Sequence, residues 1–499
     1  MLPTPLLTAA ALLLSASIEA GPVATRQASF ANCLSDAGLA PVTSDSSNYD
    51  SLSAAYNQRL QPSPAALVTP STISDISSAI KCASAAGVPI SAKSGGHSYA
   101  SYGLGGVEEE ALIIELSNFK NITVDDDGTA KIGAGNRLGD VALALNEKGR
   151  GLPHGTCPYV GIGGHASYGG YGYASRMWGL TVDTVIGFDA VLANGTVVEN
   201  VTKDSEPDLY WALAGAAPSY ALVTSFYFST FATPSNSIVF SYSYYGLSVA
   251  DQSSIFLAFQ SWGAEAAPEL GVSFIVGTGG SIQFYGAMYS DRQTYDAEIK
   301  KLLDQVPGGY DESVQELSWI DSLSAVGGDL DTSNAADSRD SFFAKSLMSP
   351  EDTPITEEAI TAFFQYLADT DTDTNWFVEV DLYGGNGSAI NSVSLDDNSF
   401  GRRNSLLVWQ LYASSSTYGN PYPEFGVTYV QAMYGALVSP MLDSWNTTYG
   451  AYINYVDPTL TDDQVKDLYW GTQYDRLSTL RTKYDPQQVF KNAQSIVPA

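Results

Sequence analysis

The stretch that decides the fold is Gly155-Thr-Cys-Pro-Tyr-Val-Gly-Ile-Gly-Gly-His165. Its glycines formally satisfy a dinucleotide-binding pattern, which requires a strand before the glycines and a helix after them. The residues before this stretch favour a turn, and Gly169, Gly170 and Gly172 disfavour a long helix after it. The sequence therefore does not predict a classical doubly wound nucleotide-binding unit here.

A second glycine-rich stretch, Ser91-Ala-Lys-Ser-Gly-Gly-His97-Ser-Tyr99, lies upstream. Successive Gly and Ser residues expose several backbone N–H groups at once and form a concavity that binds anions such as a pyrophosphate. This places a nucleotide near residues 93–98. From composition alone the alternative stays open that both stretches are merely tight surface turns.

The two stretches and their flanks hold all three histidines of the chain, His97, His154 and His165, together with Cys157. Three histidines make a multi-histidine metal site an unfavourable interpretation, so we expect no metal. A single His could still serve catalysis.

The chain has 499 residues, of which 44% are hydrophobic, so a packed core is expected and global disorder is excluded. Its 54 acidic residues against 23 basic ones give a net charge of −31, which would repel nucleic acids and anionic membranes. The expected partner is neutral or cationic. The 31 Tyr against 19 Phe supply flat apolar faces with a hydroxyl, as a carbohydrate or peptide groove needs.

The amino terminus predicts export. Residues 6–18 form an apolar run followed by Ala20 and Gly21, which is typical of a secretory signal over residues 1–20 and too short for a membrane span of about 18 residues or more. Asn-x-Ser/Thr glycosylation sequons support export, and they lie at Asn121, Asn194, Asn200, Asn386 and Asn446.

The chain contains three cysteines, an odd number. In an oxidising compartment two of them normally pair, and Cys33 and Cys82 both lie near the amino terminus. Their disulfide would leave Cys157 alone. A lone Cys is often a buried small hydrophobic residue, and that alternative stays open at this point.

Periodicity predicts an α+β fold in three parts. Residues 67–90 read as strand, amphipathic helix and strand, and short strands at 111–116, 129–132 and 185–192 follow with a helix at 138–146; this first part ends near 233. From 234 to 450, runs alternating at period two predict a large antiparallel sheet, with helices at 252–262 and 356–367 covering one face. Residues 451–499 return to short helical segments.

Taken together, the motifs resemble the vanillyl-alcohol-oxidase superfamily of flavoproteins. The resemblance rests on Ser-Gly-Gly-His97-Ser-Tyr, Gly-Thr-Cys157-Pro, the Gly-Gly-Tyr-Gly-x-x-Ser-Arg176 segment and the terminal Lys483-Tyr-Asp-Pro. Within the superfamily the chain is similar to the berberine-bridge-enzyme-like branch, and most to secreted fungal gluco- and chito-oligosaccharide oxidases. This implies a two-part FAD-binding domain over 30–233 (its PCMH-type unit about 62–233) and 451–499, interrupted by a substrate-binding domain at 234–450.

The resemblance implies FAD as the cofactor, bonded covalently through His97 to the flavin 8α carbon and through Cys157 to ring carbon 6. It also implies that Val160 guards the approach of oxygen to the flavin. The remaining positions expected to bind the cofactor are Lys93, Ser94, Gly95, Gly96, Ser98, Gly163, Gly164, His165, Tyr171, Asp183, Val185 and Asn454.

For catalysis, the resemblance implies that Tyr455, on a strand entering the C-terminal segment, acts as base with the help of Asp381 on the middle sheet. A free phenol titrates near ~10, so a carboxylate able to accept its proton is chemically useful. The expected sugar contacts are Tyr99, Trp376, Glu379 and Gln410. The stretch around Ser273 lacks the acidic or amide residue expected for a second subsite, so the sugar and its chain length stay open.

The expected activity is oxidation of the reducing-end anomeric carbon of an oligosaccharide to a lactone, which opens to an aldonic acid, with O2 reduced to hydrogen peroxide. The protein is expected to be extracellular and monomeric, without nucleic-acid or membrane partners. One alternative is a berberine-bridge-like oxidase of a small secondary metabolite. Another is a lectin-like protein with a vestigial flavin site, against which the intact His97, Cys157 and Tyr455 argue.

Overall fold

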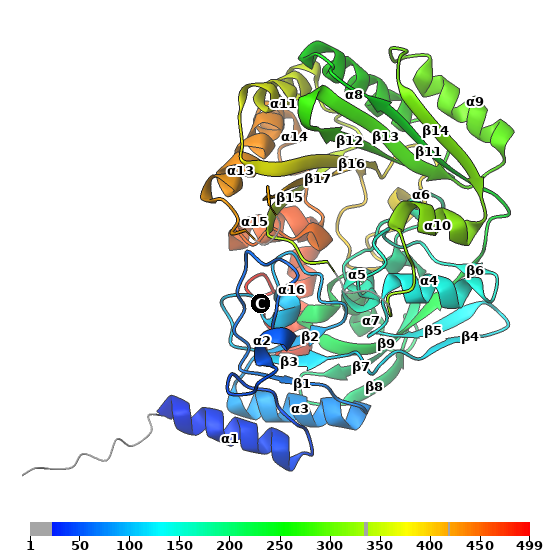
Figure 1. Cartoon of the computed structure of the whole chain (residues 1–499). Coiled ribbons are helices and arrows are strands. Elements are labelled where there is room, and N and C mark those ends of the chain that lie inside the picture. The colour runs from blue at the N-terminus through cyan, green and yellow to red at the C-terminus, as the bar shows by residue number, and fades with distance from the viewer. Residues whose placement is uncertain (1–21, 334–337, 418–419) are drawn as a thin grey trace, which may run out of the picture.

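The computed structural model describes residues 22–333, 338–417 and 420–499 (Figure 1). The expected signal at 1–20 lies outside the described residues. Among the helices that are described, none is both long and apolar enough to cross a membrane.

The first layer is a small parallel sheet in the order β1-β3-β2, formed by β1 (Ala66–Val68), β2 (Ile90–Lys93) and β3 (Leu112–Glu115). Helix α3 (Ile73–Ala86) joins β1 to β2. It begins at a capping box between Thr72 and Asp75 and ends at Gly87, whose φ of +62° suits glycine. Its residues Ile76, Ala79, Ile80 and Ala83 recur at helical spacing and are fully buried, so this face fixes the helix on the sheet.

Next to it lies an antiparallel sheet in the order β4-β5-β9-β7-β8. Its strands are β4 (Ile122–Val124), β5 (Thr129–Gly133), β7 (Val185–Leu192), β8 (Val197–Val201) and β9 (Ala221–Ser229). The helices inserted among them are α4 (Leu138–Asn146), α5 (Ile162–Ser167), α6 (Ser175–Trp178) and α7 (Pro207–Ala216).

The middle of the chain forms a seven-stranded antiparallel sheet in the order β14-β11-β13-β12-β16-β17-β15. These strands are β11 (Ser237–Tyr244), β12 (Leu270–Gly277), β13 (Ser281–Met288), β14 (Asp311–Leu317), β15 (Phe342–Pro350), β16 (Thr374–Leu382) and β17 (Ser405–Ser415). Helices α8 (Val249–Gly263), α9 (Arg292–Leu303), α11 (Glu357–Asp369) and α13 (Glu424–Val438) cover its outer face (Figure 1).

Alternation along β16 shows how this sheet separates two environments. Val378, Val380 and Leu382 are fully buried in the core under the helices. Because successive side chains of a strand point to opposite faces, Glu379 and Asp381 lie on the other face, toward the rest of the molecule. The expected antiparallel sheet and its two covering helices are thus confirmed, while β12, β14, β15 and α13 were not predicted.

The remaining elements are short or peripheral. They are α1 (Pro22–Asp36), α2 (Tyr49–Leu52), β6 (Arg150–Gly151), β10 (Phe231–Ala232), α10 (Trp319–Gly327), α12 (Ala389–Ser392), α14 (Leu442–Trp445), α15 (Asp462–Val465) and α16 (Tyr474–Tyr484).

The C-terminal segment returns to the first layer. Ile90 of β2 donates its N–H to the carbonyl of Val489 over 2.8 Å, and the core that surrounds the two smaller sheets includes Leu477, Phe490 and Ile496. The chain ends therefore build one body, with the seven-stranded sheet inserted between them in sequence.

Buried polar contacts join this body to the seven-stranded sheet. Arg176, with no exposed surface, donates to the carbonyl oxygens of Ala266, Ala267, Leu270 and Gly384 over 2.7 to 2.9 Å. Satisfying a buried guanidinium in this way fixes where the inserted sheet sits, because any shift would leave the charge without partners.

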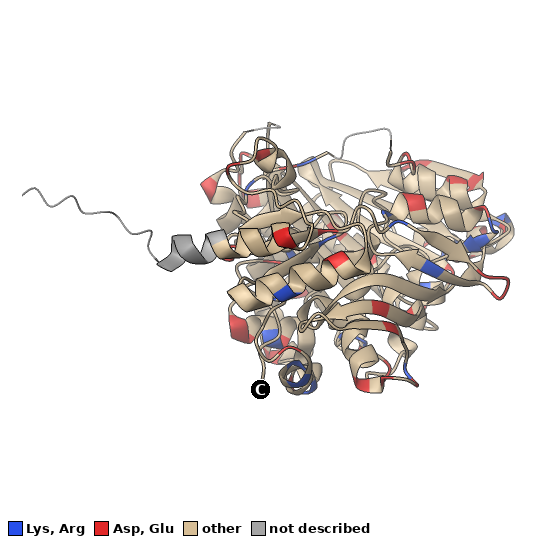
Figure 2. Ribbon diagram, turned by 90° about the horizontal axis from the view of Figure 1, so that it is seen from below, with Lys and Arg blue, Asp and Glu red and all other residues tan. Residues whose placement is uncertain are grey.

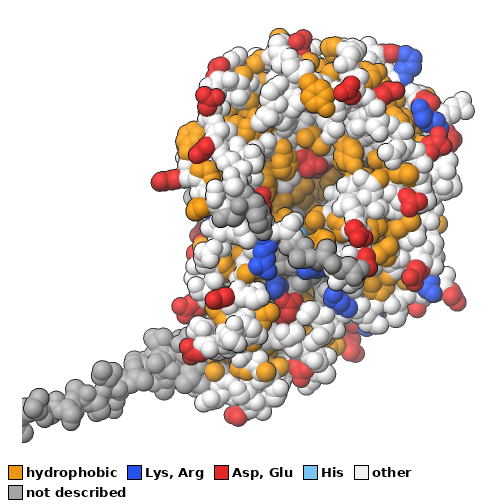
Figure 3. All heavy atoms as spheres, viewed as in Figure 1, with side chains coloured by type: hydrophobic (Ala, Val, Ile, Leu, Met, Phe, Trp, Pro, Cys, Tyr) orange, Lys and Arg blue, Asp and Glu red, His pale blue; other side chains and the backbone are white. Residues whose placement is uncertain are grey.

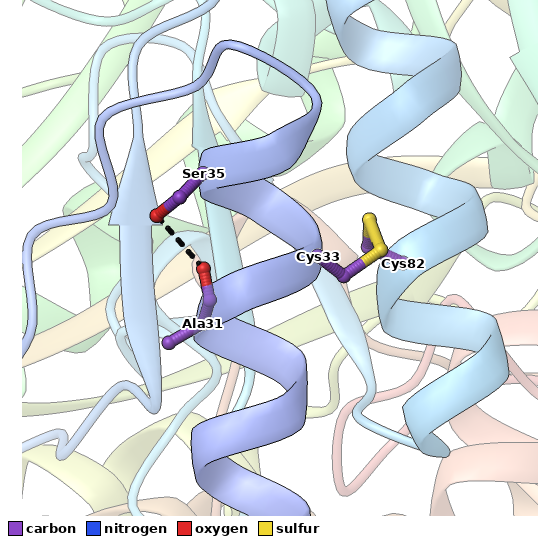
Figure 4. Close-up of a disulfide and its surroundings, with 4 residues drawn as sticks. All are labelled: Ala31, Cys33, Ser35 and Cys82. Atoms are coloured by element: carbon purple, nitrogen blue, oxygen red, sulfur yellow. Dashed lines mark hydrogen bonds between the residues drawn. A yellow bond between two sulfur atoms is a disulfide. The ribbon is translucent and has the colours of Figure 1, made fainter.

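The predicted disulfide between Cys33 and Cys82 is present and links α1 to α3 (Figure 4). The excess of acidic residues is visible on the ribbon. Figure 2 shows acidic positions spread over the face seen from below, with fewer basic positions among them.

Candidate active site

The site is a cavity of about 400 Å³ between the glycine-rich loops, the inner face of the seven-stranded sheet and the turn at 453–455. It appears as a hollow with hydrophobic side chains on its rim (Figure 3). Two walls face each other across it. We call residues 94–98 together with 155–164 the loop wall, and the cavity-facing side chains of β16 and β17 together with Tyr455 the sheet wall.

The loop wall depends on close contact between two glycines. A Cβ on Gly161 would lie 2.1 Å from the backbone nitrogen of Gly95, and one on Gly95 would lie 2.4 Å from the nitrogen of Gly161. Ser94 locks the loops together, donating its hydroxyl to the carbonyl of Ala134 over 2.6 Å and accepting the N–H of Gly163 over 3.3 Å. These glycines are needed for backbone packing, so the interpretation as simple surface turns is wrong.

His97 and Cys157 both line the cavity from this wall. The His97 ring stacks on Tyr56 with ring centres 4.2 Å apart, and Cys157 is exposed and lies outside the disulfide. The loops therefore bring an imidazole and a thiol, 60 positions apart in sequence, to the same cavity.

His165 lies in the short helix α5, not in a loop as expected. The N–H of Gly155 donates to its Nε2 over 3.0 Å, and burial followed by the proximity of His154 lowers its pKa to about 3. His165 is therefore a neutral acceptor that holds the loop before Cys157 in place.

The sheet wall carries two carboxyl groups. Glu379 and Asp381 occupy one face of β16, where Glu379 pairs with Gln410 of β17 and Asp381 pairs with Ser273 of β12. Ser273 Oγ lies 2.6 Å from Asp381 Oδ1, 3.2 Å from Glu379 Oε1 and 3.0 Å from the hydroxyl of Tyr173. Strand register thus gathers the two acids around one serine hydroxyl.

Tyr455 belongs to the 3₁₀ turn Ile453–Tyr455 and not to the strand that we expected. The turn is held by Tyr452, whose hydroxyl accepts the N–H groups of Gly170 and Tyr171 over 2.9 and 3.0 Å. The ring of Tyr455 lies parallel to that of Tyr99, 5.9 Å between centres, and Gln410 Nε2 donates to the Tyr99 hydroxyl over 2.6 Å.

Electrostatics on the sheet wall favour neutral forms. Burial raises the pKa of both Asp381 and Glu379, and the two neighbouring carboxyl groups oppose each other's ionisation. Burial, then Asp381 and Glu379, raises the pKa of Tyr455 as well. Tyr455 is therefore protonated at neutral pH and needs an acceptor before it can take a proton from anything else.

Most residues predicted for the site line the cavity together. From the cofactor prediction these are Ser94, Gly95, Gly96, His97, Ser98, Cys157, Val160, Gly163, Gly164, His165, Tyr171 and Asn454. From the catalytic and sugar-contact predictions they are Tyr99, Glu379, Asp381, Gln410 and Tyr455.

Three predicted cofactor positions lie elsewhere. Lys93 forms an ion pair with Glu115 at 2.8 Å, and Asp183 is buried in an ion pair with Arg403 at 2.6 Å. The carbonyl of Val185, at the start of β7, accepts the hydroxyl of Tyr210 over 2.6 Å. Their contacts assign them to packing beside the cavity and not to its lining.

Trp376 is likewise not brought to the cavity. Its side chain lies on the same face of β16 as Val378 and Val380, which is the face toward the helices. The Trp376 ring lies 6.5 Å from that of Tyr429 on α13. Its neighbour Phe377 has the register of Glu379 and Asp381 and stacks on Tyr412 at 4.9 Å. A shift of one residue along a strand exchanges the two faces, so Trp376 lies on the face opposite to Glu379 and Asp381.

Sequence reasoning missed several lining or supporting residues, namely Tyr56, Tyr173, Ser273 and Tyr452. Each depends on a contact between distant segments. For the three tyrosines, the excess of tyrosine was the one sequence signal; Ser273 had none.

The described residues fit a flavin nucleotide. A Cβ on Gly164, which lines the cavity, would meet nothing within 4 Å, so its backbone is open to a bound group. The buried hydroxyl of Tyr102 also lines the cavity and has no hydrogen-bond partner among the described residues. Exposed backbone and an unsatisfied polar atom along one cavity suit a cofactor with phosphate and ring portions.

The fold and the cavity together define an FAD-binding oxidoreductase. Residues 64–200 match the model of an FAD binding domain, and residues 451–497 match the berberine and berberine-like model. The chain belongs to the berberine-bridge-enzyme-like family of the vanillyl-alcohol-oxidase-type flavoproteins, as its sequence similarity to full-length relatives shows. The expected fold class and the need for FAD are therefore confirmed.

Two relatives illustrate how complete the similarity is. Glucooligosaccharide oxidase from Sarocladium strictum is 35% identical over 98% of both chains. Chitooligosaccharide oxidase from Gibberella zeae is 34% identical over 95% of this chain and 96% of its own.

One solved structure adds cofactor chemistry. It is a glucooligosaccharide oxidase from Acremonium strictum with a 6-S-cysteinyl, 8α-N1-histidyl FAD. It superposes with a TM-score of 0.88 at 33% identity, covering 94% of this chain and 99% of its own.

Proposed function

We propose that the protein is a secreted FAD-dependent oxidase that converts the reducing-end anomeric carbon of an oligosaccharide to a lactone, which opens to an aldonic acid. The observation that carries this proposal is the cavity itself, which places His97 and Cys157 on one wall and Tyr455 beside two carboxyl groups on the other. The names of the full-length relatives, gluco- and chitooligosaccharide oxidase, support a sugar as substrate.

His97 and Cys157 would hold the FAD covalently, at the flavin 8α carbon and ring carbon 6. Bound FAD supplies the acceptor for two electrons from the substrate and returns them to O2 as hydrogen peroxide. The aromatic contact of Tyr56 fixes the His97 ring, and the closely packed glycines keep both tethers at the same end of the cavity. Two tethers leave the sheet side of the cavity open to a bulky sugar.

Tyr455 and Asp381 would remove the proton from the anomeric hydroxyl. The raised pKa of Tyr455 makes it a poor base by itself, so the phenol passes its own proton toward Asp381 as it accepts the sugar's. Parallel stacking on Tyr99 holds the phenol ring in place, and Gln410 fixes Tyr99 in turn. The proton therefore passes from a phenol that the C-terminal turn positions to a carboxylate that the sheet positions.

Tyr99, Glu379 and Gln410 would contact the sugar, and Val160 would leave room for oxygen near the flavin. All four line the cavity. This proposal does not include Lys93, Asp183, Val185 and Trp376, because the contacts of these residues lie outside the cavity.

The experiment is to purify the secreted protein and ask whether its yellow colour survives acid precipitation, then to follow peroxide with cello-, xylo- and chito-oligosaccharides. We expect a yellow colour that survives acid, and peroxide formation with at least one of these three kinds of oligosaccharide. A colourless protein would contradict it. A yellow protein inert toward every sugar would favour the small-metabolite oxidase instead.

We also propose that residues 1–20 are a signal peptide, that the FAD-binding domain spans 30–233 and 451–499 around a substrate domain at 234–450, and that the protein is a monomer. All five sequon asparagines are exposed, which supports glycosylation. They are Asn121, Asn194, Asn200, Asn386 and Asn446. Mass analysis before and after glycosidase, with the amino-terminal residue of the secreted chain, checks export, and sedimentation checks the monomer.

A further inference from the structure

The cluster around Ser273 has more contacts than its hydroxyl groups have protons. Ser273 Oγ lies within hydrogen-bond distance of three oxygens, on Asp381, Glu379 and Tyr173. Each of these contacts needs one proton between its two oxygens. The serine and the tyrosine supply one hydroxyl proton each, so the third must come from a carboxyl group.

We infer that Glu379 and Asp381 share one proton at neutral pH, and that it resides on Glu379. The serine hydroxyl then donates to an ionised Asp381, while it accepts from Tyr173 and from the protonated Glu379. This arrangement uses one donor and two acceptor positions of Ser273, which is the full capacity of a hydroxyl.

The distances decide which carboxyl group carries the proton. The Ser273–Asp381 contact of 2.6 Å lies in the range of about 2.5 to 2.7 Å that is typical of a hydroxyl donating to a carboxylate. The Ser273–Glu379 contact of 3.2 Å is longer than the range of about 2.5 to 3.0 Å of ordinary O–H···O hydrogen bonds, so it is the weaker of the two contacts and does not call for a charged carboxylate. Asp381 is also 3% exposed and Ser273 is fully buried, so a second charge in this cluster would lack solvation.

The described side chains that interact electrostatically with Glu379 or Asp381 carry no positive charge that would compensate a second negative one. These are tyrosines from the loops and the C-terminal segment, each with a raised pKa. They are Tyr99, Tyr171, Tyr173, Tyr452 and Tyr455. Neutral phenols around two carboxyl groups favour the state with a single negative charge.

The consequence for catalysis rests on the proposed function. An ionised Asp381 is the form able to receive a proton from Tyr455, and a protonated Glu379 presents a donor to the cavity. Glu379 is then a positioning residue that keeps the negative charge on its neighbour.

The test is infrared spectroscopy of the holoenzyme at pH 7, without turnover, so that a wrong substrate assignment does not affect it. A protonated-carboxyl C=O band is expected in the wild type, absent from Glu379→Gln and retained in Asp381→Asn. Glu351→Gln is the matched control, since that carboxylate accepts N–H groups from Gly385 and Asn391 away from the pair and should leave the band unchanged.

A band that persists in Glu379→Gln, or a wild type without one, would overturn the inference. Isotope labelling of the wild type removes any dependence on folding of the variants: ¹³C-glutamate should shift the band and ¹³C-aspartate should not. A shift with aspartate alone would place the proton on Asp381 and overturn the assignment.

Discussion

The two walls of the cavity are built by different means. The loop wall relies on the absence of side chains, because Gly95 and Gly161 pack backbone against backbone and Gly164 leaves its backbone open. The sheet wall relies on side chains, with Glu379, Asp381 and Gln410 spaced by strand register. In the proposed function, one wall would hold the cofactor by close approach, and the other would hold protons at defined positions.

This difference predicts different responses to mutation. A methyl group added to the loop wall alters backbone packing, so stability and cofactor content should change together. An isosteric change on the sheet wall removes a proton site without moving the backbone, so catalysis should change with little effect on the fold.

The largest effect is expected for Tyr455→Phe. Removing the phenol hydroxyl leaves the ring stacked on Tyr99 but deletes the proton acceptor, so kcat should fall by about 10³-fold, within the range for general acid–base groups. Stopped-flow measurement of flavin reduction by the sugar gives the rate. The flavin absorbance per protein serves as control, and a fall of less than tenfold would mean that Tyr455 is not the base.

Asp381→Asn should lower kcat by about 10²-fold, since the amide cannot accept a proton from Tyr455. In the wild type, kcat should rise as pH increases through the pKa of Asp381, because only the ionised carboxylate accepts the proton. Burial and Glu379 raise that pKa, so the rise lies above the ordinary range of aspartate. A pH–rate profile that keeps this acid limb in Asp381→Asn would contradict the assignment.

Gly161→Ala tests the loop wall. Its Cβ would lie 2.1 Å from Gly95 N and 2.3 Å from Ser94 Oγ, and overpacking of this kind costs about 1 to 3 kcal/mol. The free energy of unfolding, measured with denaturant, and the ratio of flavin to protein should both decrease. Gly164→Ala is the matched control for stability, since its Cβ meets nothing within 4 Å, and equal destabilisation of the two variants would refute the close-packing argument.

The smallest effect is expected for Trp376→Phe. Because this side chain faces α13 and not the cavity, KM for the sugar should stay within about twofold, while the smaller ring costs at most about 1.5 kcal/mol of stability. Steady-state kinetics and thermal unfolding measure the two. A tenfold rise in KM would show that Trp376 reaches the substrate after all.

Local patterns predicted many elements of the fold correctly. The strand at 185–192 and the helix at 138–146 were predicted with the bounds that the structure has, because period-two and helical spacing are short-range properties. Strand β15, buried along its whole length, lacks the alternation that would reveal it. Tyr455 was misplaced on a strand because its turn is fixed by Tyr452, Gly170 and Tyr171 from distant parts of the chain.

The sequence by itself determined the chemistry that is present: the glycine-rich loops, two imidazoles and one thiol within them, and a tyrosine and carboxyl groups elsewhere in the chain. Only the tertiary structure decided that Asp381 and Glu379 meet at Ser273, and that Trp376 faces away. Residue types and local spacing are written along the chain, whereas strand register and the contacts between sheets arise from pairing across long separations, where one step along a strand exchanges its two faces.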